Sequence, residues 1–251
     1  MTQLASRVSP AQRGPRHPRK DSVVELIKAY IVRNQLRPGD SMPNELELCA
    51  ELDVSRGSLR EAIKTLSALD IVEVRHGFGT YVGSMSFSAL VESLAFRSLL
   101  SSADDQRVLL DLVEVRQMLE QGLADGIIRA AASGTLSDEL RTIANAMATK
   151  ASAGEEFLEE DRQFHLLLME PLGNDLIGQL TGAFWDVFAI VAPVLGPVDD
   201  DLQTTARAHA QIVDAAAAGD LEQLLQAISN HYEPIRRRVH ALSDLRRRSE
   251  V

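Results

Sequence analysis

The sequence predicts a mainly α protein in two parts: an N-terminal winged helix-turn-helix with a small β-hairpin wing, and a C-terminal antiparallel all-α bundle of about seven helices. Three helical stripes followed by a glycine-rich hairpin occupy residues 21–83. From residue 87 onward only helical periodicity is found. Composition agrees, because aromatic residues make up only 4% of the 251 residues while alanine and leucine are abundant.

Residues 21–83 contain the capping and turn residues expected for three helices and a hairpin. Asn44 with Glu47 forms a capping box that opens the second helix, and Ser55 caps a third helix that runs to about residue 69. Two short β-rich runs follow, separated by a tetrapeptide with two glycines that suits a hairpin turn. These runs are 71–75 and 80–82.

The helices of the second part are separated by glycines and prolines, and their short connections favour antiparallel packing. The expected helices are 87–101, 105–131, 137–151, 155–170, 174–192, 199–218 and 220–243. The expected divisions of the chain are a disordered basic tail (1–20), the winged domain (21–83), a linker with the first bundle helix (84–104), the main helical domain (105–243) and a basic C-terminal tail (244–251).

Charge is distributed unevenly between the two parts. The net charge is −10, yet residues 1–83 carry 12 basic and 10 acidic side chains, so the remainder holds the whole acidic excess. This asymmetry favours an anion-facing first part on an acidic body.

A single cysteine, Cys49, excludes an internal disulfide framework and fits a reducing compartment. We find no signal peptide and no apolar run of membrane-spanning length. We therefore expect a cytoplasmic protein with no membrane partner.

The start of the third helix has the residues of a DNA-reading surface. In a helix-turn-helix this end enters the major groove, and here Leu59 faces the core, so its neighbours point away. Arginine can bind guanine, serine can bind a phosphate or base edge, and glycine allows close approach. The candidate contacts are Arg56, Gly57, Ser58 and Arg60, with His76 and Gly77 at the wing tip. The competing interpretation is that Arg56 and Arg60 are ordinary solvated charges.

Residues 36–45 (LRPGDSMPNE), 54–56 (VSR), 59–62 (LREA) and 76–82 (HGFGTYV) resemble the GntR family of transcriptional regulators in order and spacing. The resemblance implies contacts to double-stranded DNA from the residues named above and also from Ser55, the cap residue of the reading helix.

Three histidines and one carboxylate share inward-facing helical stripes. Asp161 and His165 lie four residues apart, while His209 and His231 lie at similar heights on either side of a turn at 219–220. Such a set suits one divalent transition metal per chain, with open positions for water or a ligand: zinc first, nickel or manganese as alternatives. The competing interpretation is a group of hydrogen-bonded core histidines.

Arg116 shares a stripe with three leucines and is expected to face the bundle interior. A buried guanidinium needs an anion. Within the protein this anion is Glu114, Glu120 or Asp161; otherwise it is a bound ligand.

The second part resembles the FCD-type effector domain of the FadR subfamily, through DRQFH at 161–165 and through His209 and His231. The resemblance implies a dimerising bundle in which the aspartate and the three histidines hold a metal. Through Glu114-x-Arg116 it also implies that Arg116 binds a small carboxylic acid. Pro234 predicts a kink or break just after His231.

The predicted function is a ligand-responsive, sequence-specific DNA-binding transcriptional regulator, a repressor released from its operator by a small organic acid. A single winged domain contacts few bases, so we expect a homodimer on a pseudo-palindromic operator. The alternative is a metal-dependent hydrolytic enzyme that activates water at the metal. No further motif supplies a general base for that chemistry.

Overall fold

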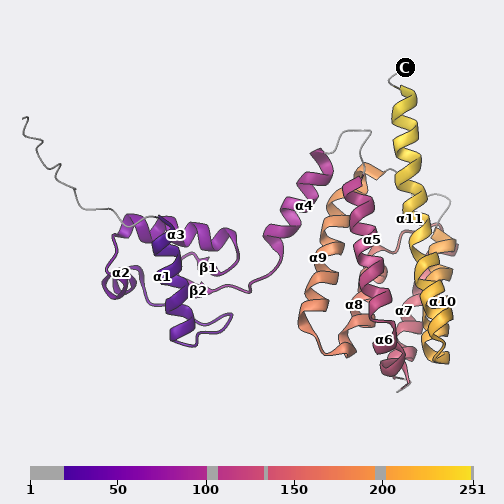
Figure 1. Cartoon of the computed structure of the whole chain (residues 1–251), viewed down its shortest axis with the longest axis horizontal. Coiled ribbons are helices and arrows are strands. Elements are labelled where there is room, and N and C mark those ends of the chain that lie inside the picture. Colours follow the sequence, from indigo (N-terminus) through magenta and orange to yellow (C-terminus); the bar gives the residue numbers. More distant parts are fainter. Residues whose placement is uncertain (1–19, 101–106, 133–134, 196–201, 250–251) are drawn as a thin grey trace, which may run out of the picture. The chain divides into compact units, whose positions relative to one another are not determined.

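A computed structural model describes residues 20–100, 107–132, 135–195 and 202–249 (Figure 1). By their contacts, the residues up to Ser86 form one compact unit and those from Phe87 form a second. The predicted mainly α class is confirmed. Among the described helices, none is both long and apolar enough to cross a bilayer. The basic tail expected at 1–20 lies outside the described residues, apart from Lys20.

The first unit contains three helices and an antiparallel hairpin, which pairs Val72 with Val82 and Arg75 with Gly79. Both expected caps are formed: Asn44 and Glu47 make a capping box, and Ser55 caps the third helix. The elements are α1 (Lys20–Arg33), α2 (Glu45–Leu52), α3 (Arg56–Ala68), β1 (Val72–Arg75) and β2 (Gly79–Val82).

The core of the first unit is the contact between α1 and α3. Val23 and Ile27 of α1 and Leu59 and Leu66 of α3 are fully buried there. Burying each such side chain contributes about 1.5–3 kcal/mol. This contact fixes α3 on the unit and leaves its opposite face in solvent.

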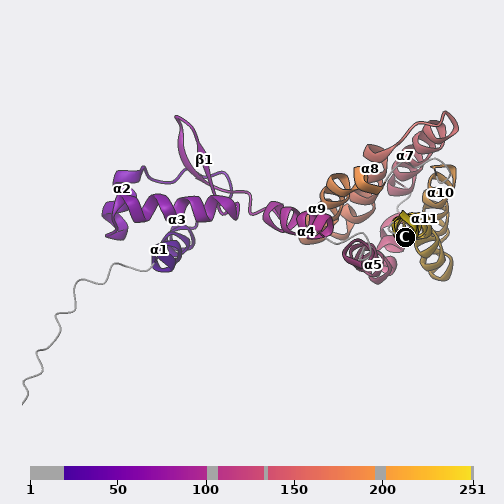
Figure 2. The same ribbon diagram turned by 90° about the horizontal axis from the view of Figure 1, so that it is seen from above.

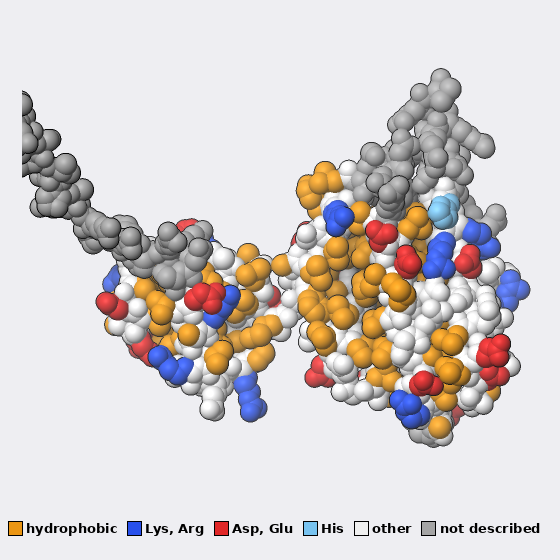
Figure 3. Space-filling model, viewed as in Figure 1, with side chains coloured by type: hydrophobic (Ala, Val, Ile, Leu, Met, Phe, Trp, Pro, Cys, Tyr) orange, Lys and Arg blue, Asp and Glu red, His pale blue; other side chains and the backbone are white. Residues whose placement is uncertain are grey.

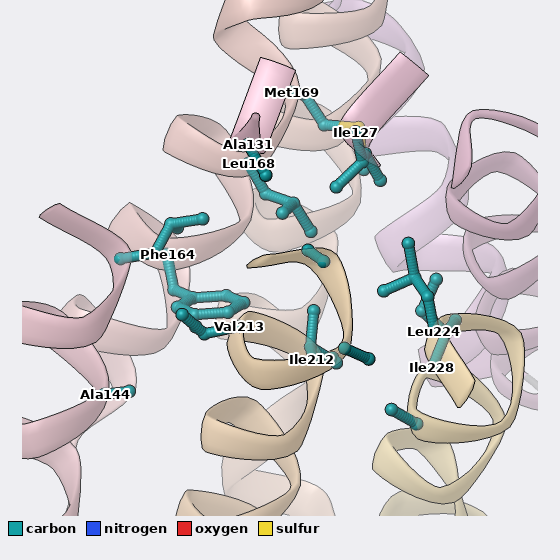
Figure 4. Packing of buried hydrophobic residues seen from close by; sticks show 14 of the residues in the cluster. Ile127, Ala131, Ala144, Phe164, Leu168, Met169, Ile212, Val213, Leu224 and Ile228 are labelled. Carbon is teal, nitrogen blue, oxygen red and sulfur yellow. The ribbon is translucent and has the colours of Figure 1, made fainter. Parts of the chain in front are cut away.

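The second unit is a helical bundle in which α11 packs against α10 and α5 (Figure 2). In its core, Phe164 and Leu168 face Ile212 and Val213 (Figure 4). The helices are α4 (Ser88–Leu100), α5 (Arg107–Gly122), α6 (Ala124–Ala131), α7 (Thr135–Ser152), α8 (Leu158–Met169), α9 (Asp175–Val191), α10 (Leu202–Ala218) and α11 (Leu221–Ser249), with 3-10 turns η1 (Glu170–Leu172) and η2 (Ala192–Leu195).

The expectation of one helix over 105–131 is wrong: α5 ends at Gly122 and α6 begins at Ala124. The amide of Leu123 donates to the carbonyl of Glu120, a tighter turn than an α-helical one. Glycine weakens a helix at this point, while the apolar stripe continues across the break and conceals it.

Pro234 does not break α11, which is continuous from Leu221 to Ser249. Its ring removes the amide that would bond to the carbonyl of Asn230, but the surrounding helix tolerates this loss. The tail expected at 244–251 continues α11 as far as Ser249, and residues 250–251 lie outside the described part.

Gly83 allows a close approach that no other residue permits. A Cβ atom there would lie 2.2 Å from the carbonyl oxygen of Asp70. We expect Gly83→Ala to destabilise the first unit by about 1–3 kcal/mol, because the backbone must shift. The free energy of unfolding of the first unit is measured by urea denaturation, with hydrogen exchange of the first-unit amides as the readout.

The matched control is Gly122→Ala, since nothing lies within 4 Å of its added methyl group. The fluorescence of Trp185, the single tryptophan, reports separately on the second unit. Equal unfolding midpoints for Gly83→Ala and wild type would contradict the close approach.

Candidate functional site

The second unit brings Asp161, His165, His209 and His231 together from α8, α10 and α11; we call them the Asp–His cluster. The three histidines are buried, and one candidate ligand atom from each of the four residues lies within 4.8 Å of the others. The Oδ1 atom of Asp161 is 3.2 Å from Nε2 of His165 and 3.0 Å from Nε2 of His209. The Nε2 atoms of His165 and His231 are 3.1 Å apart.

The hydrogen bonds of His209 determine what its inner nitrogen can do. Its Nδ1–H donates to the backbone carbonyl of Thr205 at 2.8 Å. With Nδ1 as the donor, a ring that carries a single proton presents a lone pair at Nε2, directly against a carboxylate oxygen of Asp161. Two acceptors this close repel each other unless a proton or a metal ion lies between them.

Glu120 of α5 also belongs to the site. From the sequence it was expected only as a possible ion-pair partner of Arg116. It is buried, and its Oε1 atom lies 2.8 Å from Nδ1 of His165. Burial raises the pKa of Glu120, but the adjacent His165 and Arg116 outweigh burial and lower the pKa to about 2. Its spacing of four residues from Arg116, on one inward face, was the signal that could have found it.

The cluster combines ionised carboxylates with at least one neutral imidazole. Burial raises the pKa of Asp161, but His209 and His165 bring it well below its ordinary value. Burial and the two neighbouring histidines lower the pKa of His231, so this ring stays neutral.

The donor set fits a divalent ion of the zinc class. Bonds of about 2.0–2.2 Å from one such ion to nitrogen and oxygen ligands hold neighbouring ligand atoms about 3 Å apart in octahedral geometry and about 3.4 Å apart in tetrahedral geometry. The separations of 3.0–3.2 Å around Asp161 and His165 are close to these distances, and all four ligand atoms lie within 4.8 Å of one another. Glu120 then occupies the outer position that orients a metal-bound histidine.

Arg116 lies between two aromatic rings. Its Cζ atom is 4.8 Å from the ring centroid of Trp185 and 5.6 Å from that of Tyr232. Its Nε atom is 3.5 Å from Oε1 of Glu120, one of the internal partners considered from the sequence. Nε and Nη2 are nevertheless buried without a hydrogen-bond partner. The guanidinium is held in place with donors still unused.

A cavity of about 500 Å³ adjoins the Asp–His cluster, within the size range of small-molecule sites. Arg116, Asp161 and His231 all line it. The same space therefore meets a cation, a carboxylate and an imidazole, which suits a small ligand with an acid group.

In the first unit, the start of α3 is exposed at Arg56, Gly57 and Arg60. Arg60 pairs with Glu45 of α2 at 2.9 Å while most of its side chain stays in solvent. An added Cβ at Gly57 would meet only Oγ of Ser55, at an ordinary 3.9 Å. Packing among the described residues does not require glycine here.

The other expected DNA contacts have structural roles as well. Oγ of Ser55 accepts from the amide of Ser58 and lies 2.9 Å from its hydroxyl group. His76 and Gly77 are exposed in the turn between β1 and β2, where Gly77 has φ +81°. The turn geometry explains Gly77, because a left-handed residue is strained unless it is glycine.

A winged helix-turn-helix and a helical bundle with a cavity, carried by one polypeptide, define the class of one-component transcriptional regulators. The chain matches the gntR family of bacterial regulatory proteins over residues 19–82 and the FCD domain over residues 111–234. It belongs to the GntR family: it is a ligand-responsive DNA-binding regulator and not an enzyme, so the hydrolase alternative is wrong.

Its relatives are regulators. The chain is 59% identical over 98 residues to the putative transcriptional regulatory protein NedR of Micromonospora viridifaciens, covering 39% of this chain and 71% of that protein. It is 25% identical over 208 residues to the galactonate operon transcriptional repressor of Escherichia coli K12, covering 82% and 90%. The structure of a Streptococcus agalactiae GntR protein superposes with a TM-score of 0.63 at 26% identity, covering 87% and 99%.

We expect Glu120→Gln to weaken zinc binding by about 10–100-fold, because a neutral amide loses the electrostatic attraction of the carboxylate for the Nδ1 edge of His165, 2.8 Å away. Titration against a chromophoric chelator measures the affinity. Glu114→Gln is the matched control, since Glu114 is exposed on the same helix. Equal zinc affinity in both variants would mean that Glu120 serves only Arg116.

Proposed function

We propose that this regulator is a homodimeric repressor that leaves its operator when a small carboxylic acid binds beside a metal in the second unit. The observation that carries the proposal is the cavity, in which the unused donors of Arg116 and the Asp–His cluster line one space. A ligand with an acid group satisfies both.

The metal site is Asp161, His165, His209 and His231, holding one divalent transition metal per chain, zinc in preference to nickel or manganese. The 3.0 Å approach of Nε2 of His209 to Asp161, with Nδ1 engaged by Thr205, supports this assignment. When bound, the ion supplies a Lewis acid for an oxygen of the ligand. Thr205 fixes the tautomer of His209, and Glu120 directs Nε2 of His165 inward.

Arg116 binds the carboxylate of the acid. Its planar fork matches a carboxylate in two parallel hydrogen bonds, and stacking between Trp185 and Tyr232 orients it beforehand. The name of the galactonate operon repressor supports an acid, because galactonate is a carboxylic acid.

DNA is read by Ser55, Arg56, Gly57, Ser58 and Arg60 at the start of α3, with His76 and Gly77 in the wing. All of these residues are exposed except the half-buried Ser58, which supports this, and packing among the described residues gives no reason for glycine at position 57. Two copies of the chain read the two halves of a pseudo-palindromic operator.

Exposed apolar side chains on the second unit support the homodimer (Figure 3). Phe96 and Leu100 of α4 and Val115 and Met118 of α5 are about half or more exposed. Apolar surface of this kind is typical of an interface. Acid binding joins α5, α8 and α11 around the cavity, and release from DNA follows if the acid prefers a dimer whose half-site spacing differs.

We expect Arg56→Ala and Arg60→Ala each to weaken specific binding by about 1–3 kcal/mol, the loss of one bidentate base contact. Binding sites selected from random DNA by the wild-type protein serve as probes, at fixed salt. Lys64→Ala, exposed further along the same helix, is the control and should change affinity little. Unchanged affinity in both arginine variants would overturn the proposed docking.

We expect Arg116→Lys to keep zinc and DNA binding and to lose the response to acids, because an ammonium group cannot form the two parallel hydrogen bonds. Release of the selected DNA by a panel of carboxylic acids measures the response. Arg141→Lys, an exposed change that keeps its charge, is the control. A wild-type response from Arg116→Lys would make Arg116 an internal ion-pair partner only.

A further inference from the structure

The polar and apolar parts of the cavity are separated. Arg116, Asp161, Thr205 and His231 gather at or beside the Asp–His cluster. The carbonyl of Thr205 is already engaged by His209. Most of the remaining lining is apolar, so the cavity has a charged end at the cluster and mainly apolar walls beyond it.

The apolar walls extend away from the cluster along three helices. Leu109 and Leu112 lie about two turns and one turn before Arg116 on α5. Phe188 lies about one turn after Trp185 on α9, and Ile235 lies one turn after His231 on α11. Seven residues of helix span about 10 Å, so the cavity continues well beyond the acid-binding end.

The cavity is too large for a three-carbon acid. At about 30 Å³ per liquid water molecule, its 500 Å³ corresponds to roughly 16 waters. A small hydroxy acid bound at Arg116 would leave most of the apolar lining in contact with water, whereas a longer apolar body would bury it.

A sugar acid fits the walls poorly. Each of its hydroxyl groups needs a hydrogen-bond partner once it leaves water. Two further charged residues line the cavity: Glu156, which is solvent-exposed, and Arg238, about 10 Å along α11 from His231. Nε1 of Trp185 and the hydroxyl group of Tyr232, two lining residues, are also buried without a hydrogen-bond partner. All other lining residues away from the Asp–His cluster are apolar, so a hydroxyl group on every carbon would face mostly apolar side chains.

We infer that the effector is an amphipathic carboxylate: its acid group lies at Arg116 and the Asp–His cluster, and its body is an aliphatic or aromatic group of more than three carbons. This inference rests on the proposed function, since it takes the acid-binding end from there. It adds the chemistry of the rest of the molecule.

Two six-carbon acids form a matched pair of probes. 2-Hydroxyhexanoate and gluconate share the carboxylate and the neighbouring hydroxyl group and differ only in the hydroxyls at carbons 3 to 6. Isothermal titration into the zinc-loaded full-length protein should give an affinity about 100-fold higher for 2-hydroxyhexanoate, the discrimination that an apolar pocket makes against one hydroxyl. From lactate to 2-hydroxyhexanoate, affinity should rise about fourfold per added methylene.

Phe184 tests the apolar wall, because it lines the cavity from α9 but lies outside the hydrophobic clusters that hold the helices together. Phe184→Gln should lower the affinity for 2-hydroxyhexanoate about tenfold or more and leave that for lactate nearly unchanged. Leu176→Gln, an exposed change on the same helix, should alter neither.

The outcomes distinguish an error in the apolar body of the effector from an error in the acid-binding site. If gluconate binds as tightly as 2-hydroxyhexanoate, or if affinity is flat across the chain-length series, the apolar body is wrong and the acid site stands. If Arg116→Lys abolishes binding of every acid that the wild type takes, the acid site is supported independently. If neither class of acid binds the zinc-loaded wild type, the proposed function fails and this inference fails with it.

Discussion

Asp161 imposes the constraint on which the second unit depends. A largely buried carboxylate is costly unless it is paired, and Asp161 has imidazole nitrogens from α8 and α10 within 3.2 Å. His231 of α11 joins through His165. Because these rings must direct Nε2 at one small volume, the three helices are fixed to one another at that height. Phe164, one residue before His165, then packs against α10 without freedom to slide.

The same constraint spreads to α5 through Glu120. Its carboxylate lies against Nδ1 of His165 and near Nε of Arg116, so a single side chain connects the cluster with the cation beside it. The polar interior therefore occupies one compact region, while the cavity beyond it is bounded mostly by apolar side chains such as leucine, phenylalanine and isoleucine. The charged groups around the cluster are concentrated at one end of the cavity because Asp161, His165, Glu120 and Arg116 contact one another in series.

Helical periodicity explains why much of this was predictable. Asp161 and His165 share a face because they are four residues apart, and the turn at Gly219 brings His209 and His231 to one height. The two capping residues Asn44 and Ser55 fixed helix starts by local hydrogen bonding alone. Such features depend on residues close in sequence.

The features that the sequence did not predict depend on contacts between residues far apart in the chain. The helix break at Leu123 was invisible because an apolar stripe crosses it, and only packing decides whether a glycine ends a helix. The role of Glu120 depends on His165, 45 positions away in the chain. Periodicity alone relates Glu120 only to Arg116, four residues away on the same helix. The cavity itself is formed by residues of five helices, α5, α8, α9, α10 and α11, and leaves no signal in any one of them.

Arg116 shows how such an interior prepares for a ligand. Its charge is stabilised by the faces of Trp185 and Tyr232 and by a long contact to Glu120, none of which uses up Nη2. Burial lowers the pKa of Arg116, but the surrounding residues more than compensate, so the pKa is raised and the charge is retained. The desolvation of the guanidinium has therefore already occurred before any acid arrives, and its orientation is set. An acid that binds here gains the hydrogen bonds without displacing a competing internal partner, which is the advantage of a preorganised site.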